Sequence, residues 1–142
     1  MAKSYLVIIL SMFISIQSIS QQNSLLNIHS KLIKILEFKD TTLKSEKEMF
    51  QKCKKWEITS KDILIAFSLS KLITPEQKSG LYNWLPCYYK CMVRYKGINY
   101  TMEINGASYF TLYNKSETLY FGCSNYECEK YFILKGGNAS AD

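Results

Sequence analysis

The sequence predicts a single disulfide-stapled α+β domain in which N-terminal helices pack on one face of a four- to five-stranded antiparallel β-meander. Two patterns predict this class. Apolar residues recur at three- and four-residue spacing in the first half of the chain, whereas after Pro86 they alternate with polar residues. Nine of the eleven Tyr and four of the five Cys also follow Pro86. Strands favour such aromatic residues, so the second half should form the sheet.

Residues 1–20 have the pattern of an export signal. Lys3 precedes an apolar run, and Ser18 and Ser20 occupy the −3 and −1 positions of a cleavage site before Gln21. The run is short for a membrane span and is interrupted by polar residues, which disfavours the alternative of an uncleaved anchor. We therefore expect a periplasmic protein without a stable membrane anchor after cleavage. Its single domain should cover residues 21–135, and residues 136–142 should form a flexible tail.

The chain carries a mild basic excess, with a formal net charge of +6. Its lysines gather around residues 44–55, but Glu46 and Glu48 lie among them, which is typical of a solvated helix face. A phosphate-binding tract would not be interrupted in this way, so we expect no binding to nucleic acid. The excess is compatible with an acidic protein partner.

The first two helices are expected in residues 23–38 and after Ser45. One face of the first would carry five apolar residues, namely Leu25, Ile28, Leu32, Ile35 and Leu36. Ser45 and Glu48 have the spacing of a capping box at the start of the second helix. Cys53 would face the core from this helix as a buried, unpaired thiol.

Two further helices are indicated by capping residues. Thr59 and Ser60 precede a third apolar-periodic segment, with Asp62 in its first turn, where a carboxylate complements the helix dipole. Thr74 and Pro75 begin a fourth, shorter helix, because proline is tolerated in the first turn and threonine can cap it.

Five strands are expected after Pro86. The segments 89–95 and 98–104 would join at Lys96-Gly97. Asn105-Gly106 has the strongest hairpin signal of the chain, because both residues tolerate the positive φ of a type I′ turn. The remaining strands are expected at residues 108–113, 119–123 and 128–134.

The cysteines predict disulfide bonds, because export leads to an oxidising compartment. Cys123 and Cys128 bracket a short loop and should take part in at least one bridge. Cys87 and Cys91 cannot bridge each other on one straight strand, since about 13 Å would separate their Cα atoms. They would pair across a turn or with the other two cysteines. A four-thiolate zinc site is the alternative, but its spacings are unusual, and we expect no metal or other cofactor.

Composition argues against an enzyme. The chain has a single His, His29, at the edge of the first predicted helix, and no second catalytic residue can be named for it. A pair of carboxylates could still act together in the sheet half, which offers Glu103, Glu117, Glu127 and Glu129. Acidic residues on the polar face of a strand are usually solvated, so we expect no catalytic site.

A protein-binding surface is the alternative use of the aromatic residues. Tyrosine offers a large contact area together with a hydroxyl group, and arginine is enriched at protein interfaces. High β-propensity alone would also explain many tyrosines in a sheet. The predicted partner-binding residues are Arg94, Tyr95, Tyr100, Tyr109, Tyr113 and Tyr120. The same surface could instead form a symmetric homodimer.

Short motifs are spread across residues 56–134. The most specific are Ile104-Asn105-Gly106 and Gly122-Cys123, followed by Cys128 and Tyr131-Phe132; the others are Trp56, Ile58, Asp62-Ile63, Pro86-Cys87, Tyr95-Lys96-Gly97 and Tyr100. Together they resemble small exported bacterial immunity proteins encoded beside contact-dependent toxins, including those delivered by type VI secretion. The chain departs from the pattern in having Cys53 and Cys91.

The resemblance implies a non-enzymatic periplasmic protein that occludes the active site of a cognate toxin. Two alternatives remain open at this point. One is a periplasmic inhibitor of a peptidoglycan hydrolase or lysozyme, which is the same physical class with another partner. The other is a small exported ligand-binding domain or enzyme that uses His29 or a pair of glutamates.

Overall fold

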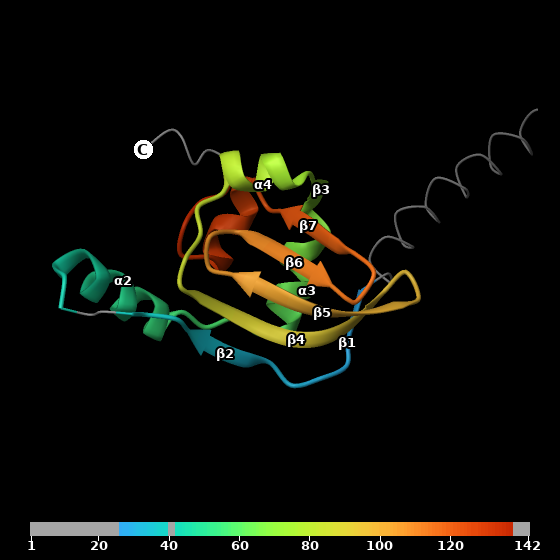
Figure 1. Ribbon diagram of the computed structural model, residues 1–142, viewed down its shortest axis with the longest axis horizontal. Coiled ribbons are helices and arrows are strands. Elements are labelled where there is room, and N and C mark those ends of the chain that lie inside the picture. The colour runs from blue at the N-terminus through green and yellow to red at the C-terminus, as the bar shows by residue number, and fades with distance from the viewer. Residues whose placement is uncertain (1–25, 40–41, 138–142) are drawn as a thin grey trace, which may run out of the picture.

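A computed structural model describes residues 26–39 and 42–137 and shows an α+β fold built on one curled antiparallel sheet (Figure 1). The predicted export signal, residues 1–20, lies outside the described residues. The sheet has seven strands in the order β1-β4-β5-β6-β7-β3, and β2 pairs with β4 beside β1. The strands are β1 (Leu26–Ile28), β2 (Ile33–Leu36), β3 (Lys71–Ile73), β4 (Cys87–Tyr95), β5 (Ile98–Asn105), β6 (Tyr109–Tyr113) and β7 (Thr118–Gly122).

The predicted fold class and the meander are confirmed. Strands β4 to β7 follow one another in sequence and pair in that order, each antiparallel to the next. In the part of the chain that the structure describes, four helical segments accompany the sheet: α2 (Lys44–Lys55), α3 (Ser60–Leu69), α4 (Pro75–Leu81) and the 3₁₀ helix η1 (Tyr126–Tyr131).

The helix expected in residues 23–38 is wrong, because the described part of this segment forms β1 and β2. Both strands pair with the long strand β4, Leu26 lying opposite Tyr95 and Ile33 opposite Lys90. The break between them remains hydrogen-bonded to β4, since His29 N donates to Met92 O and Met92 N donates to Ser30 Oγ. Pairing with an open sheet edge has overridden the helical spacing of the apolar residues.

The helix starts are confirmed for α3 and α4 but not for α2. Thr59 and Asp62 form a reciprocal capping box at the start of α3, and Thr74 and Gln77 form another at the start of α4. The capping box expected from Ser45 and Glu48 is wrong: α2 begins after Leu43, whose side chain makes no capping hydrogen bond, and Ser45 already lies within the helix.

The turn at Lys96-Gly97 is confirmed, and both residues have the positive φ that a type I′ turn requires. The type I′ turn expected at Asn105-Gly106 is wrong. This connection is longer, and its positive φ falls on Ser108, whose N–H donates to Asn105 O. The strand expected at residues 128–134 is also wrong, because Tyr126–Tyr131 forms η1, begun by a hydrogen bond from Glu127 N to Asn125 Oδ1.

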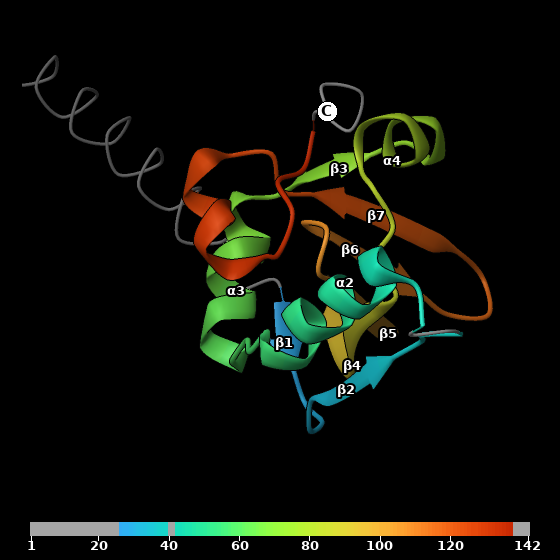
Figure 2. The ribbon, with the colours of Figure 1, turned by 90° about the vertical axis from the view of Figure 1, so that its left-hand side faces the viewer.

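Helices α3 and η1 cover one face of the sheet, and the hydrophobic core lies between them and the strands (Figure 2). Phe67 of α3 is the centre of an aromatic cluster, with ring centroids 5.7 Å from Tyr95, 5.4 Å from Phe110 and 4.7 Å from Phe121. The buried Trp56 fixes η1 to the segment before α3, because its Nε1 donates to Tyr131 O at 2.8 Å.

Two disulfide bonds staple the fold. Cys123 and Cys128 take part in a disulfide, as the sequence predicts, and their partners are each other. Cys53 is buried but not unpaired: it bridges Cys87, which ties α2 to the start of β4. Cys91 is the free thiol instead, and burial raises its pKa to about 11. The two bridges fit an oxidising compartment. Among the described residues, no helix is both long and apolar enough to cross a bilayer.

Candidate functional site

The second face of the sheet, here called the open face, has no described helix across its centre (Figures 1 and 2). Residues directly opposite each other on paired strands point to the same face, so the alternation along β4 determines which side chains lie there. Tyr88, Lys90, Met92 and Arg94 point to the open face, whereas the cysteines of β4 are buried in the core.

Four of the six predicted partner-binding residues lie on the open face. Tyr109 and Tyr113 are on β6, and the exposed Arg94 is on β4. Tyr120 is on β7, where it lies opposite Thr111 of β6. Lys78 of α4 joins the tyrosines at one edge of this face, with its Nζ 5.1 Å from the ring centroid of Tyr109 and 5.9 Å from that of Tyr120.

Tyr95 and Tyr100 are on the opposite, helix-covered face. Tyr95 packs edge-on against Phe67 and Phe121. Tyr100 is only 2% exposed, and its hydroxyl donates to a carboxylate oxygen of Glu117. That hydrogen bond is the main reason why the pKa of Tyr100 is raised to about 12. These two rings belong to the packing of the core rather than to the surface that holds the other four residues.

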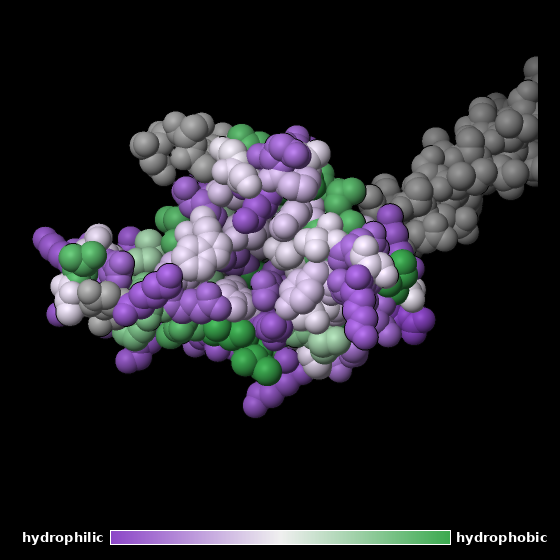
Figure 3. Space-filling model, in the orientation of Figure 1, coloured by the Kyte–Doolittle hydropathy of each residue, from purple (hydrophilic) through white to green (hydrophobic). Residues whose placement is uncertain are grey.

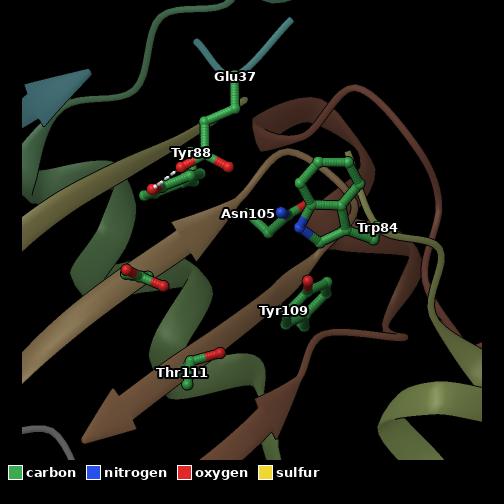
Figure 4. A pocket seen from close by; sticks show the side chains of 7 residues that line it. Glu37, Trp84, Tyr88, Asn105, Tyr109 and Thr111 are labelled. Atoms are coloured by element: carbon green, nitrogen blue, oxygen red, sulfur yellow. Dashed lines mark hydrogen bonds between the residues drawn. The ribbon is translucent and has the colours of Figure 1, made fainter. Parts of the chain in front are cut away.

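A cleft of about 270 Å³ opens on this face where the α4–β4 connection runs beside the end of β5 and the start of β6 (Figure 4). Two carboxylates, three aromatic rings and a hydroxyl line it: Glu37, Glu103, Trp84, Tyr88, Tyr109 and Thr111. We call this site the Trp84 cleft. Trp84 is 56% exposed and forms its rim.

The buried amide of Asn105 builds the cleft. Its Oδ1 accepts hydrogen bonds from Leu85 N at 3.2 Å and Ala107 N at 3.0 Å, and its Nδ2 donates to Leu85 O at 2.9 Å. The two hydrogen bonds between Asn105 and Leu85 hold Leu85 against the end of β5. They thereby place the neighbouring Trp84 over the sheet. Asn105, which the sequence suggests for a tight turn, therefore positions the rim of the cleft instead.

The electrostatics of the cleft are dominated by its two carboxylates. Glu37 Oε1 accepts a hydrogen bond of 2.6 Å from the Tyr88 hydroxyl, and this bond is the main reason why the pKa of Tyr88 is raised to about 12. Glu103 accepts from the Tyr113 hydroxyl at 3.4 Å and lies 3.8 Å from Lys90 Nζ. Burial, followed by the charge of Glu103, raises the pKa of Tyr109 to about 12.

Apolar side chains adjoin the cleft along the edge of the open face. Ile33 is 59% exposed and Met92 is 41% exposed. Figure 3 shows hydrophobic side chains gathered where β2 lies, beside the paler and more polar surface over the centre of the sheet. A second hollow, of about 440 Å³, shares Glu37 and Trp84 with the cleft, and its apolar lining includes Phe38, Met49 and Pro86. The face thus combines apolar, aromatic and charged groups, as protein interfaces do.

The other residues considered from the sequence do not form a common site. His29 is exposed in the break between β1 and β2. Glu117 is bonded to Tyr100, Glu129 lies 3.1 Å from Lys135 Nζ, and Glu127 is exposed at the start of η1. In residues 26–39 and 42–137, no cluster of His, Cys, Asp or Glu could hold a metal ion.

Several site residues were missed by the sequence analysis. The alternation along β4 was a usable signal for Tyr88 and Lys90, since both share the face of Arg94. Glu37 and Trp84 lie outside the strands, and hydrogen bonds made elsewhere position their segments: Glu37 N donates to Pro86 O at 2.7 Å. A local pattern carries no information about such a contact.

No family model, curated protein or solved structure matches this chain. A function must therefore be argued from the open face itself.

Proposed function

We propose that this chain is an exported binding protein that inhibits a cognate antibacterial toxin in the periplasm by covering the toxin's active site with the open face. The observation that carries the proposal is the composition of this uncovered face. It presents Tyr113 and Tyr120 beside the exposed Arg94, Met92 and Trp84, which are residue types that commonly anchor protein interfaces.

Two further observations support the proposal. The disulfides are suited to an oxidising compartment such as the periplasm. The resemblance of residues 56–134 to exported immunity proteins supports a toxin as the partner. A rigid face of this kind could occlude a partner's cleft without changing its own backbone, because the long pairing of β4 with β5 fixes the register of the side chains.

The test begins with the chain from Gln21 onward and the product of the neighbouring gene. We expect a one-to-one complex by size-exclusion chromatography, and restored growth when that product is directed to the periplasm. No complex and no rescue would overturn the toxin proposal. If the chain inhibits a peptidoglycan hydrolase and not the toxin, the toxin proposal is overturned in favour of the other class of inhibitor. If the chain self-associates through the open face, the proposal is overturned in favour of a homodimer.

A pair of variants tests which surface binds. Arg94→Ala combined with Tyr113→Ala should weaken the complex by about 100-fold, because truncating interface anchors commonly costs 1–3 kcal/mol each. The matched control is Ile65→Ala on α3, where the side chain is 38% exposed on the helical side of the molecule. This control should leave the affinity unchanged. The reverse pattern would move the binding site to the helices and overturn the assignment to the open face.

A further inference from the structure

The Trp84 cleft contains a tyrosine that lacks an internal partner. Tyr109 is only 4% exposed, yet its hydroxyl makes no hydrogen bond to any residue of 26–39 or 42–137. Figure 4 shows this hydroxyl pointing to the space beside Trp84, with the one dashed hydrogen bond of the view joining Tyr88 and Glu37. Among the described residues no buried side-chain oxygen or nitrogen lacks a hydrogen-bond partner, so this hydroxyl is not sealed in the core and instead reaches the open space of the cleft. It is therefore available to bond a group from outside the chain.

The charges of the cleft define that group further. Glu37 and Glu103 both line it, and among the described residues Lys90 is the cation that pairs with one of them, Glu103. Lys78 lies over the ring of Tyr109 at 5.1 Å and makes no ion pair with either carboxylate in this part of the chain. A cation is therefore favoured in the cleft, although the chain as a whole is basic.

The hydrogen-bonding groups distinguish a guanidinium from a simple cation. The cleft presents several acceptors, since each carboxylate has a second oxygen and the hydroxyls of Tyr109 and Thr111 also accept. A guanidinium carries five donors and no acceptor, can bind a carboxylate through two parallel bonds, and stacks on aromatic faces such as that of Trp84. The volume of about 270 Å³ is far larger than the roughly 30 Å³ of one water, so it admits a side chain.

We propose that the Trp84 cleft binds the guanidinium group of an arginine side chain that the protein partner inserts between Trp84, Glu103 and the Tyr109 hydroxyl. This inference rests on the proposed function for the source of the arginine. Its chemistry, however, depends only on the cleft and can be tested without the partner.

The first experiment is an NMR titration of the chain with N-acetyl-arginine-N-methylamide. We expect a saturable shift of the Trp84 indole N–H, whereas the indole of Trp56, which is bonded to Tyr131 O, should not move. The citrulline analogue has the same shape without the charge and should bind about tenfold more weakly, because charge-assisted hydrogen bonds are the stronger ones. Equal binding of both compounds, no saturable shift, or a preference for N-acetylglucosamine would overturn the proposal.

Variants then locate the binding. Glu103→Gln and Tyr109→Phe should each weaken arginine binding about tenfold by removing a charge or a hydroxyl. Tyr109→Phe keeps the buried ring, so the variant should remain folded. Glu127→Gln is the matched control, because this exposed carboxylate lies on η1 and not in the cleft. Equal loss in the control and cleft variants would show a general charge effect and overturn the site.

The toxin complex separates this inference from the proposed function. Unchanged toxin affinity in Glu103→Gln and Tyr109→Phe would overturn the arginine cleft while leaving toxin inhibition standing. Arginine binding in the cleft without any toxin complex would instead overturn the proposed partner and leave the chemistry of the cleft supported.

Discussion

Tyr82 shows how single glycines shape this fold. Its buried ring lies directly against Gly122 and Gly136, where a Cβ atom at either glycine would overlap the ring. At Gly122 a Cβ atom would lie 2.8 Å from Tyr82 Cε2 and closer still to Tyr82 Cζ and the hydroxyl oxygen. The absence of a side chain at these positions therefore lets the segment after α4 pack against β7.

We predict that Gly122→Ala lowers the free energy of unfolding by about 1–3 kcal/mol, the usual cost of overpacking a core. Urea unfolding at pH 7 measures it. Gly80→Ala is the control, because open space surrounds that helical glycine and alanine there should be neutral or stabilising by about 0.5–1 kcal/mol. The double variant Gly122→Ala with Tyr82→Leu should lose less unfolding free energy than the sum of the losses in the two single variants. Strict additivity would contradict the overlap with the ring.

The predictability of the site also depends on individual residues. Residue type alone named Arg94, Tyr113 and Tyr120, but it also named Tyr95 and Tyr100, which the alternation along β4 and β5 places on the helix-covered face. The burial of Tyr109 could not be predicted, because its ring packs against Tyr82 in the chain segment that also carries Trp84. That segment is fixed by the Asn105 amide, and the bond from Asn105 to Leu85 links residues twenty positions apart.

At the scale of elements, the start of α3 depends on a charged capping box. Asp62 accepts hydrogen bonds from the Thr59 N–H at 3.0 Å and from the Thr59 hydroxyl at 2.7 Å. These bonds, led by the one from the backbone N–H, lower the pKa of Asp62 below its ordinary range. A lowered pKa in the folded state means that the stabilisation is complete above the pKa of the unfolded chain and is lost as the pH falls through the folded pKa.

We predict that Asp62→Ala lowers the free energy of unfolding by about 1 kcal/mol at pH 7, as loss of a cap does, and that this difference disappears toward pH 2. Urea unfolding at several pH values measures it. Gln77→Ala provides the matched control in α4, where the capping box is neutral. Its cost should not depend on pH over the same range. A pH-independent cost for Asp62→Ala would contradict a role for the carboxylate charge.

The elements differ in how well local sequence predicts them. Helices α3 and α4 were predictable because their caps lie within three residues of the helix start. Strands β1 and β2 were not, because Ile28 and Ile35 satisfy a helical period and a β-propensity equally well. The edge of β4 decides between them, since pairing there satisfies backbone groups that would otherwise remain open. Nothing within residues 26–36 reveals that edge.

At the scale of the whole molecule, the two disulfides do different work. Cys53–Cys87 spans 34 positions and joins α2 to the sheet, whereas Cys123–Cys128 spans five and closes the loop before η1. The buried Cys91 should not exchange with either disulfide. Its raised pKa of about 11 keeps the thiol protonated, whereas thiol–disulfide exchange requires a thiolate as the attacking species. Reshuffling in the folded protein should therefore be slow.

We predict that Cys53→Ala with Cys87→Ala lowers the free energy of unfolding by about 4 kcal/mol, against about 2 kcal/mol for Cys123→Ala with Cys128→Ala, because a bridge over a longer loop restricts the unfolded chain more. Urea unfolding of the oxidised proteins measures both values. Alkylation with mass spectrometry verifies the bridges: the parent chain should react at one thiol, Cys91, and only when unfolded. Similar costs for the two pairs would mean that native packing, and not loop length, sets the contribution of each bridge.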